Sequence, residues 1–136
     1  MAELSGRCFC GSATWRASGE PVRNLVCHCG DCRRATSSPF TAFVGLNPAA
    51  VAWSGPINDY ESSPGSWHGF CPTCGARLYF RSGKWPGKIH IHAATLDDVH
   101  LYHPSAQVVL RARADWLDAL REIPAHQGFQ HDPEEH

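Results

Sequence analysis

The chain has 136 residues, 12 Lys and Arg against 13 Asp and Glu, and a formal net charge of -1. That length suits one domain of about 100 to 150 residues with a real hydrophobic core. No basic run could neutralise a track of phosphates, which excludes a typical nucleic-acid partner. No segment reaches the roughly 18 continuous apolar residues of a membrane span, and the first residues lack the apolar core of a secretion signal. We therefore expect a single cytoplasmic domain over 1–136, with no membrane partner and a flexible tail from about residue 125.

The apolar segments are short, rich in β-branched and aromatic residues, and separated by Gly, Pro, Ser and Asn. This pattern predicts many brief strands and a mainly β, β-rich α+β fold. The expected strands span 12–18, 41–46, 76–81, 88–94 and 106–111. His90 and His92 alternate within 88–94, so they are expected to face the same way as half-exposed strand residues. Trp116 and Leu120 recur at helical spacing, which predicts one short helix capped by Asp115.

Seven cysteines fall into three groups: Cys8 and Cys10; Cys27, Cys29 and Cys32; and Cys71 and Cys74. The odd number and the close spacing favour metal ligands over a disulfide framework. In the stretch CPTCG, the turn between the two cysteines is expected to point backbone amides at the sulfurs. The following Gly75 lets the chain leave the turn in a left-handed conformation.

Spacing alone leaves two divisions of these thiols open. The pair Cys71 and Cys74 could be completed by Cys29 and Cys32, as in a zinc ribbon, which leaves Cys27 and the first group over. The same pair could instead be completed by the first group, which leaves the thiols of CHCGDC together. Either way, four thiolates close a tetrahedral zinc site and three leave one position open. Iron–sulfur clusters also use thiolates, but three ligands fit an open zinc site better than a full cluster.

The stretches GRCFCGSATW, CHCGDCRRATSSPF, SSPGSWHGFCPTCGARLYF and AATLDD give the chain a family likeness. Over about residues 5 to 120 it resembles the glutathione-dependent formaldehyde-activating enzyme family, which also includes centromere protein V. The resemblance implies a β-tent fold, as in a zinc-binding exchange-factor chaperone, and two zinc ions per chain. It assigns a structural zinc to Cys8, Cys10, Cys71 and Cys74. It assigns a catalytic zinc to Cys27, Cys29 and Cys32.

The implied activity is that of a carbon–sulfur lyase similar to S-(hydroxymethyl)glutathione synthase, with a glutathione-like thiol and formaldehyde or another small aldehyde as partners. Three thiolates donate much electron density to zinc, so the ion polarises a carbonyl only weakly. It can still bind a fourth thiol in its deprotonated, thiolate form. Arg33 and Arg34 are candidates to pair with substrate carboxylates, and His28 is a candidate proton carrier. Phe40 is expected to form a wall beside the catalytic loop. The alternative function is a zinc-stabilised module that binds protein or nucleic acid without catalysis.

The chain departs from the family pattern at three positions and keeps every zinc ligand. Ser37 stands where the family commonly has Gly, so a positive φ there would carry an energetic cost and reshape the adjoining pocket. His68 replaces an Arg, which makes any charged contact there dependent on pH. Gln107 corresponds to a His that could otherwise serve as a ligand or base.

Overall fold

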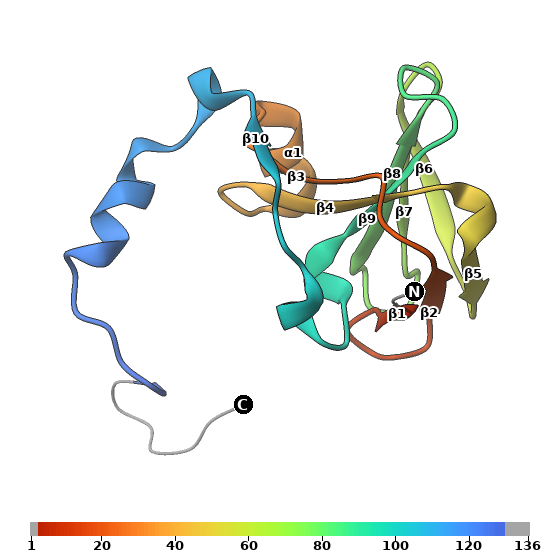
Figure 1. Ribbon diagram of the computed structural model, residues 1–136, viewed down its shortest axis with the longest axis horizontal. Coiled ribbons are helices and arrows are strands. Elements are labelled where there is room, and N and C mark those ends of the chain that lie inside the picture. The colour runs from red at the N-terminus through yellow and green to blue at the C-terminus, as the bar shows by residue number, and fades with distance from the viewer. Residues whose placement is uncertain (1–2, 130–136) are drawn as a thin grey trace.

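The computed structural model describes residues 3–129, and its chain is built mainly of short strands (Figure 1). The strands are β1 (Glu3–Arg7), β2 (Thr14–Ser18), β3 (Arg23–Cys27), β4 (Thr41–Leu46), β5 (Val51–Ser54), β6 (Asn58–Ser63), β7 (Ser66–Phe70), β8 (Arg77–Ser82), β9 (Ile89–His92) and β10 (Ala106–Val108). The helices are α1 (Gly30–Thr36) and the 3-10 helices Pro48–Ala50, Ala93–Thr95, Val99–Leu101, Leu110–Ala112 and Asp115–Arg121. The expected mainly β fold with short helices is confirmed.

These strands form two sheets. The smaller sheet has the order β1-β2-β5, and both of its pairings are antiparallel. The larger sheet has the order β10-β3-β4-β9-β8-β7-β6. All of its neighbours are antiparallel except β10, which runs parallel to β3. The centre of the larger sheet is therefore β9 and its neighbours, while β10 and β6 form the edges.

The core lies where one apolar face of each sheet is buried. Leu4 and Trp15 from the smaller sheet join Val44, Leu78 and Ile91 from the larger sheet in one buried cluster. The Trp15 side chain is only 1% exposed, and burying so large an apolar surface is worth roughly 2–3 kcal/mol. A Cβ added to the neighbouring Gly6 would lie 2.4 Å from Trp15 Nε1, so the ring packs closely on β1 only because that residue is glycine.

The opposite face of the larger sheet carries histidines and aromatic rings. His90 and His92 are 4% and 7% exposed, so the expectation that they are half-exposed is wrong. They lie on β9, a central strand, where both faces are covered. The Phe43 ring contacts both imidazoles, with centroids 5.7 Å and 5.0 Å away, so the two histidines do face the same way. Arg23 Nη2 lies 3.0 Å from His90 Nε2, to which it donates.

After β10 the chain extends away from the two sheets as an arm, residues 110–129 (Figure 1). The predicted helix is present as a 3-10 helix, but Ala114 is its N-cap residue and no side chain caps it, so the expected cap by Asp115 is wrong. Trp116 is 55% exposed, because this arm has no apolar face of the body to pack against. Much of the tail expected to be flexible lies outside the described residues. Within 3–129 no helix has the length and apolarity needed to cross a membrane.

Helix α1 is held at both ends by features of its own sequence. Cys29 Sγ accepts a hydrogen bond from the Cys32 amide at 3.2 Å and so caps the N-terminus. Ser37 ends the helix with φ 54° and ψ 37°, in the left-handed region, and its amide donates to the Arg33 carbonyl. The positive φ considered for Ser37 from the sequence is therefore present, with the cost that a side chain brings there.

Replacing Ser37 by Gly should stabilise the fold by about 0.5–1 kcal/mol, because Gly adopts the left-handed conformation without a Cβ clash. Urea unfolding of the two proteins measures this difference. The control is Ser38→Gly, since Ser38 has a negative φ and gains nothing from the added freedom. Equal effects of the two substitutions would contradict the account of the helix end.

The buried imidazole of His90 makes stability depend on pH. Burial, and then the charges of Arg23 and Lys88, lower its pKa to about 4 from the ordinary value of 6.5. Between pH 6.5 and about pH 4, the imidazole is protonated in the unfolded chain but not in the folded one. The free energy of unfolding should therefore fall as the pH falls through this range. In His90→Gln an amide oxygen can still accept from Arg23 but does not titrate. We expect a shallower loss of stability in that variant.

Urea midpoints of wild type and His90→Gln from about pH 6.5 down to about pH 4 measure the effect. Protonation of the cysteines on acidification affects both proteins alike, so the difference between the two curves reports on the imidazole. Parallel curves would show that His90 does not contribute.

Candidate functional site

Two turns that are distant in sequence bring four cysteine sulfurs together. Cys8 and Cys10 follow β1, Cys71 and Cys74 lie between β7 and β8, and all four sulfurs lie within 4.8 Å of one another. Cys10 Sγ is 3.6 Å from Cys8 Sγ and 3.8 Å from Cys71 Sγ. A tetrahedron of sulfurs around zinc, with bonds of about 2.3 Å, has edges of about 3.8 Å. This four-cysteine cluster therefore fits a closed metal site, and its separations are far from a disulfide bond of about 2 Å.

Hydrogen bonds around the four-cysteine cluster favour the ionised thiol. Ser12 Oγ lies 3.0 Å from Cys10 Sγ and 3.5 Å from Cys71 Sγ, and the Ala13 amide donates to Cys8 Sγ at 3.3 Å. The hydroxyl of Ser12, followed by the amide of Cys74, lowers the pKa of Cys71 to about 6. Such donors are typical of thiolates that ligate a metal. The expected left-handed exit from this turn is present, since Gly75 has φ 79°.

The remaining three cysteines form a second group around the start of α1. Cys27 is the last residue of β3, Cys29 caps α1, and Cys32 lies in its first turn. Their sulfurs also lie within 4.8 Å of one another, and all three residues are partly exposed. No other His, Cys, Asp or Glu between residues 3 and 129 adds a ligand atom to this three-cysteine cluster. It thus offers a metal three ligands, and no described residue supplies the fourth ligand of a tetrahedron.

Because these thiols lie close together, they shift the pKa values of Cys27 and Cys32 in opposite directions. A hydrogen bond from the Cys32 thiol is the main cause that lowers the pKa of Cys27 to about 5. The same contact raises the pKa of Cys32, because its proton is held by the neighbouring sulfur. Three sulfurs this close need protons or a cation between them, and a bound metal replaces those protons.

His28, the candidate proton carrier, is placed away from solvent. Its side chain is 2% exposed, Nε2 lies 2.8 Å from Gln107 Oε1, and the ring centroid lies 5.7 Å from that of Phe40. Gln107 is on β10, which pairs with β3 directly before His28. This placement favours a structural role in which His28 and Gln107 fasten the cysteine loop to the sheet. The role of Gln107 in this contact was not foreseen from the sequence.

Arg33 and Arg34 fold back toward the first residue of α1. A Cβ added to Gly30 would lie 3.0 Å from Arg34 Nη1 and 3.6 Å from Arg33 Nη2. Both guanidinium groups therefore lie beside the residue that follows Cys29. Their positive charge is placed to offset thiolates of the three-cysteine cluster or to attract an anionic substrate.

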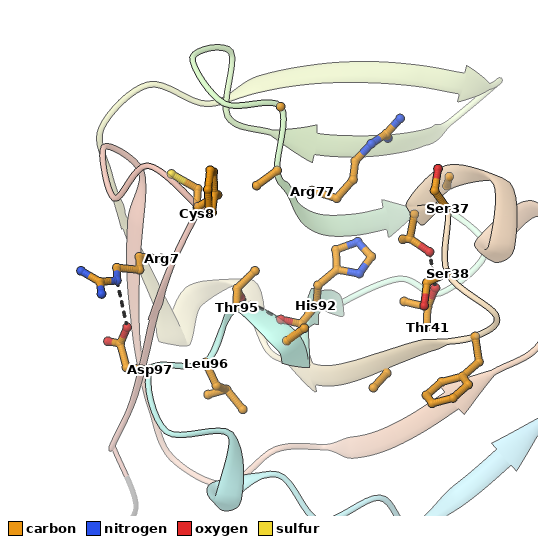
Figure 2. Close-up of a pocket in the computed structure, with 18 residues that line it drawn as sticks. Arg7, Cys8, Ser37, Ser38, Thr41, Arg77, His92, Thr95, Leu96 and Asp97 are labelled. Carbon is orange, nitrogen blue, oxygen red and sulfur yellow. Dashed lines mark hydrogen bonds and ion pairs between the residues drawn. The ribbon is translucent and has the colours of Figure 1, made fainter. Parts of the chain in front are cut away.

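A cleft of about 740 Å³ is lined by Cys8 of the four-cysteine cluster and by residues that follow the three-cysteine cluster in the chain, including Ser37, Ser38 and Thr41 (Figure 2). Cys8 lines one end, while Phe40, Thr36 and Thr41 line the other, so the expected position of Phe40 as a wall residue fits this cleft. The hydroxyls of Thr36 and Thr41 donate to the Cys32 carbonyl at 2.8 Å and 3.4 Å. The three sulfurs do not line the cleft themselves; it adjoins them through these threonines.

Two further residues of the cleft, Arg77 and His92, were not among the predicted site residues. Both side chains are on the part of the cleft that carries Ser37, Ser38 and Thr41 (Figure 2). The sequence offered one signal for Arg77, since it comes two residues after Gly75 of the cysteine turn. Nothing in the local sequence links His92 to that turn, because the pairing of β8 with β9 brings them together.

Comparisons with known proteins agree with this geometry. A crystal structure of a Rhodobacter sphaeroides protein has the same fold, with a TM-score of 0.61 at 19% identity, over 76% of this chain and 99% of that chain. An uncharacterized lyase of Schizosaccharomyces pombe is 30% identical over 118 residues, which are 87% of this chain and 86% of the relative. The family model described as glutathione-dependent formaldehyde-activating enzyme matches residues 3–112. The chain therefore belongs to the glutathione-dependent formaldehyde-activating enzyme family.

Proposed function

We propose that the chain is a zinc-dependent carbon–sulfur lyase that joins a thiol, glutathione or a similar molecule, to formaldehyde or another small aldehyde. Family membership and the yeast relative that is named a lyase support this class of reaction. The observation that carries the proposal is the contrast between the two clusters. Four sulfurs can close one site, whereas three partly exposed sulfurs leave a position for an incoming thiol.

The four-cysteine cluster is the proposed structural zinc site, and Cys27, Cys29 and Cys32 are the proposed ligands of the second zinc. When bound there, zinc supplies an open coordination position at which a thiol is held as its thiolate at neutral pH. In the proposed reaction the thiol gives up its proton, its sulfur bonds to the aldehyde carbon, the carbonyl π electrons move to the oxygen, and that oxygen takes up one proton in place of the one that the thiol released. Atoms and electrons balance without an oxidant or a reductant, and the reverse reaction cleaves the carbon–sulfur bond.

The surrounding residues position the thiol and attract it. Cys29 joins the ligand set to the helix, because the sulfur that would bind metal also accepts from the Cys32 amide. Thr36 and Thr41 hold the Cys32 carbonyl from the side of the cleft. Arg33 and Arg34 supply positive charge next to Gly30, where an anionic thiol would arrive.

One feature favours the alternative of a protein-binding module. The arm, residues 110–129, exposes large apolar side chains, including Leu110, Trp116 and Ile123. An exposed apolar surface of this kind is typical of contact with another protein. Most of the arm, residues 113–129, lies outside the region that the family model matches, so such binding would add to the lyase activity and not replace it.

Cys29→Ser should abolish thiol-dependent aldehyde consumption and leave the fold in place. Serine is a preferred N-cap residue, so its hydroxyl can accept the Cys32 hydrogen bond and keep α1, while the thiolate ligand is lost. Loss of free formaldehyde in the presence of glutathione measures activity, and metal analysis should show one zinc fewer per chain than in the wild type.

Asp31→Asn is the matched control, since it changes the same turn of the helix without touching a sulfur. It should retain both the metal and the activity. An unchanged rate in Cys29→Ser would exclude the three-cysteine cluster from the reaction. Two bound zinc ions without turnover on any thiol and aldehyde would favour the binding module.

A further inference from the structure

We infer that the end of the cleft formed by Arg77 and His92 binds a carboxylate group, and that this carboxylate belongs to the thiol substrate. The first part of the inference concerns a binding site and stands on its own geometry. The second part rests on the proposed function, because it identifies the substrate as a thiol that carries a carboxylate some bonds away from its sulfur.

Arg77 carries a positive charge that nothing in the described structure neutralises. Its Nη1 atom is buried and has no hydrogen-bond partner, and no ion pair among residues 3–129 includes it. The guanidinium lies 5.9 Å from the ring centroid of Phe70. By contrast, Arg81 on the same strand donates to Asp59 at 3.0 Å. Arg77 is only partly buried, but leaving its buried Nη1 without an acceptor costs free energy, which indicates an anion as the missing partner.

His92 supplies a second unpaired polar atom in the same place. Its Nε2 atom is buried without a hydrogen-bond partner, although the residue lines the cleft. Burial, followed by the influence of His68 and Arg77, lowers the pKa of His92 to about 4, so the imidazole is neutral at neutral pH. A neutral imidazole has one N–H group, and a bound carboxylate would select the tautomer with that proton on Nε2.

The charges in the cleft fit an anion with a single charge. At the end with Arg77 and His92, the other labelled groups are the hydroxyls of Ser38 and Thr41 and the side chain of Ser37 (Figure 2). At the opposite end, Arg7 Nε lies 3.8 Å from an Asp97 oxygen, so that pair is already balanced. One guanidinium with a neutral donor beside it matches a carboxylate, whereas a phosphate dianion would leave one charge unpaired.

The position of this subsite relative to the three-cysteine cluster suits a single small ligand. Thr41 lines the cleft and pairs with Cys27 across β4 and β3. A molecule that reaches from Arg77 past Thr41 would bring its other end toward the open side of the sulfurs. The subsite would then hold the substrate by its carboxylate while its thiol reacts.

Propionate, a carboxylate without a thiol, tests the site independently of turnover. In nitrogen-15 spectra of the histidine side chains, propionate should shift the His92 resonances, and propan-1-ol should not. The exposed His100 is the internal reference. Arg77→Gln should weaken propionate binding about 10- to 100-fold, as expected for loss of a charge-assisted hydrogen bond.

The matched control is Arg81→Gln, which removes an arginine from the same strand and should leave propionate affinity unchanged. If Arg77→Gln does not fold, Arg77→Lys keeps the charge without the two-pronged donor and should still bind propionate measurably more weakly. Wild-type affinity in the Arg77 variants, or inorganic phosphate that binds more tightly than propionate, would overturn the carboxylate site.

The link to the substrate is tested by comparing two thiols that differ only in one group. We expect 3-mercaptopropionate to have a KM about 10-fold or more below that of 3-mercaptopropan-1-ol, and Arg77→Gln to remove the difference with little change in kcat. Equal KM values in the wild type would overturn the assignment to the substrate. No turnover with either thiol would reject the proposed function, while the propionate experiment would still decide the carboxylate site.

Discussion

The central constraint on this structure is that it brings cysteine sulfurs so close together that their thiolates would repel one another unless protons or a metal ion lay between them. In the four-cysteine cluster, the sulfurs of Cys8 and Cys10, both in the turn after β1, lie 3.6 Å apart, and Cys10 Sγ lies 3.8 Å from the sulfur of Cys71 in the turn after β7. Thiolates at such distances repel one another, so protons or a metal ion must lie between them. The turn after β1 belongs to the smaller sheet and the turn after β7 to the larger one. A metal ion in this cluster would therefore join the two sheets at the edge of the core.

The three-cysteine cluster has one sulfur fewer than the four-cysteine cluster, and it differs from it in which parts of the chain supply the sulfurs. Its ligands come from one short segment that begins with the end of β3 and includes the first turn of α1, so it links no distant parts of the chain. The burial of His28 against Gln107 and Phe40 fixes this segment to the sheet. A site that the fold does not need for its stability can leave a ligand position for a substrate. Under the proposed function, one set of cysteines would stabilise the fold and the other would bind the substrate thiol.

How far the sequence predicts this arrangement differs from element to element. The apolar strands β2, β4, β8 and β9 were foreseen because their β-branched and aromatic residues stand out, whereas β6 was missed because all of its residues are exposed and, apart from Tyr60, polar. Spacing predicted metal-binding groups of four and three cysteines, and the structure brings the thiols together in groups of these sizes. Spacing could not show which thiols share a site, because that depends on the meeting of two turns 61 residues apart in the chain.

Helix α1 was also missed, since Cys29 is not among the usual cap residues. His92 is buried, and it lines the same cleft as Arg77, because β9 lies next to β8 in the sheet. A local sequence pattern does not predict the order of strands in a sheet.

The central claim is that the three-cysteine cluster holds a metal whose fourth ligand is the sulfur of the substrate. A crystal structure of the zinc-loaded protein with glutathione bound tests this claim most directly. The account predicts zinc bound to Cys27, Cys29 and Cys32, with the thiol sulfur as the fourth ligand at about 2.3 Å. A protein side chain in that fourth position, with glutathione bound elsewhere or not at all, would contradict it.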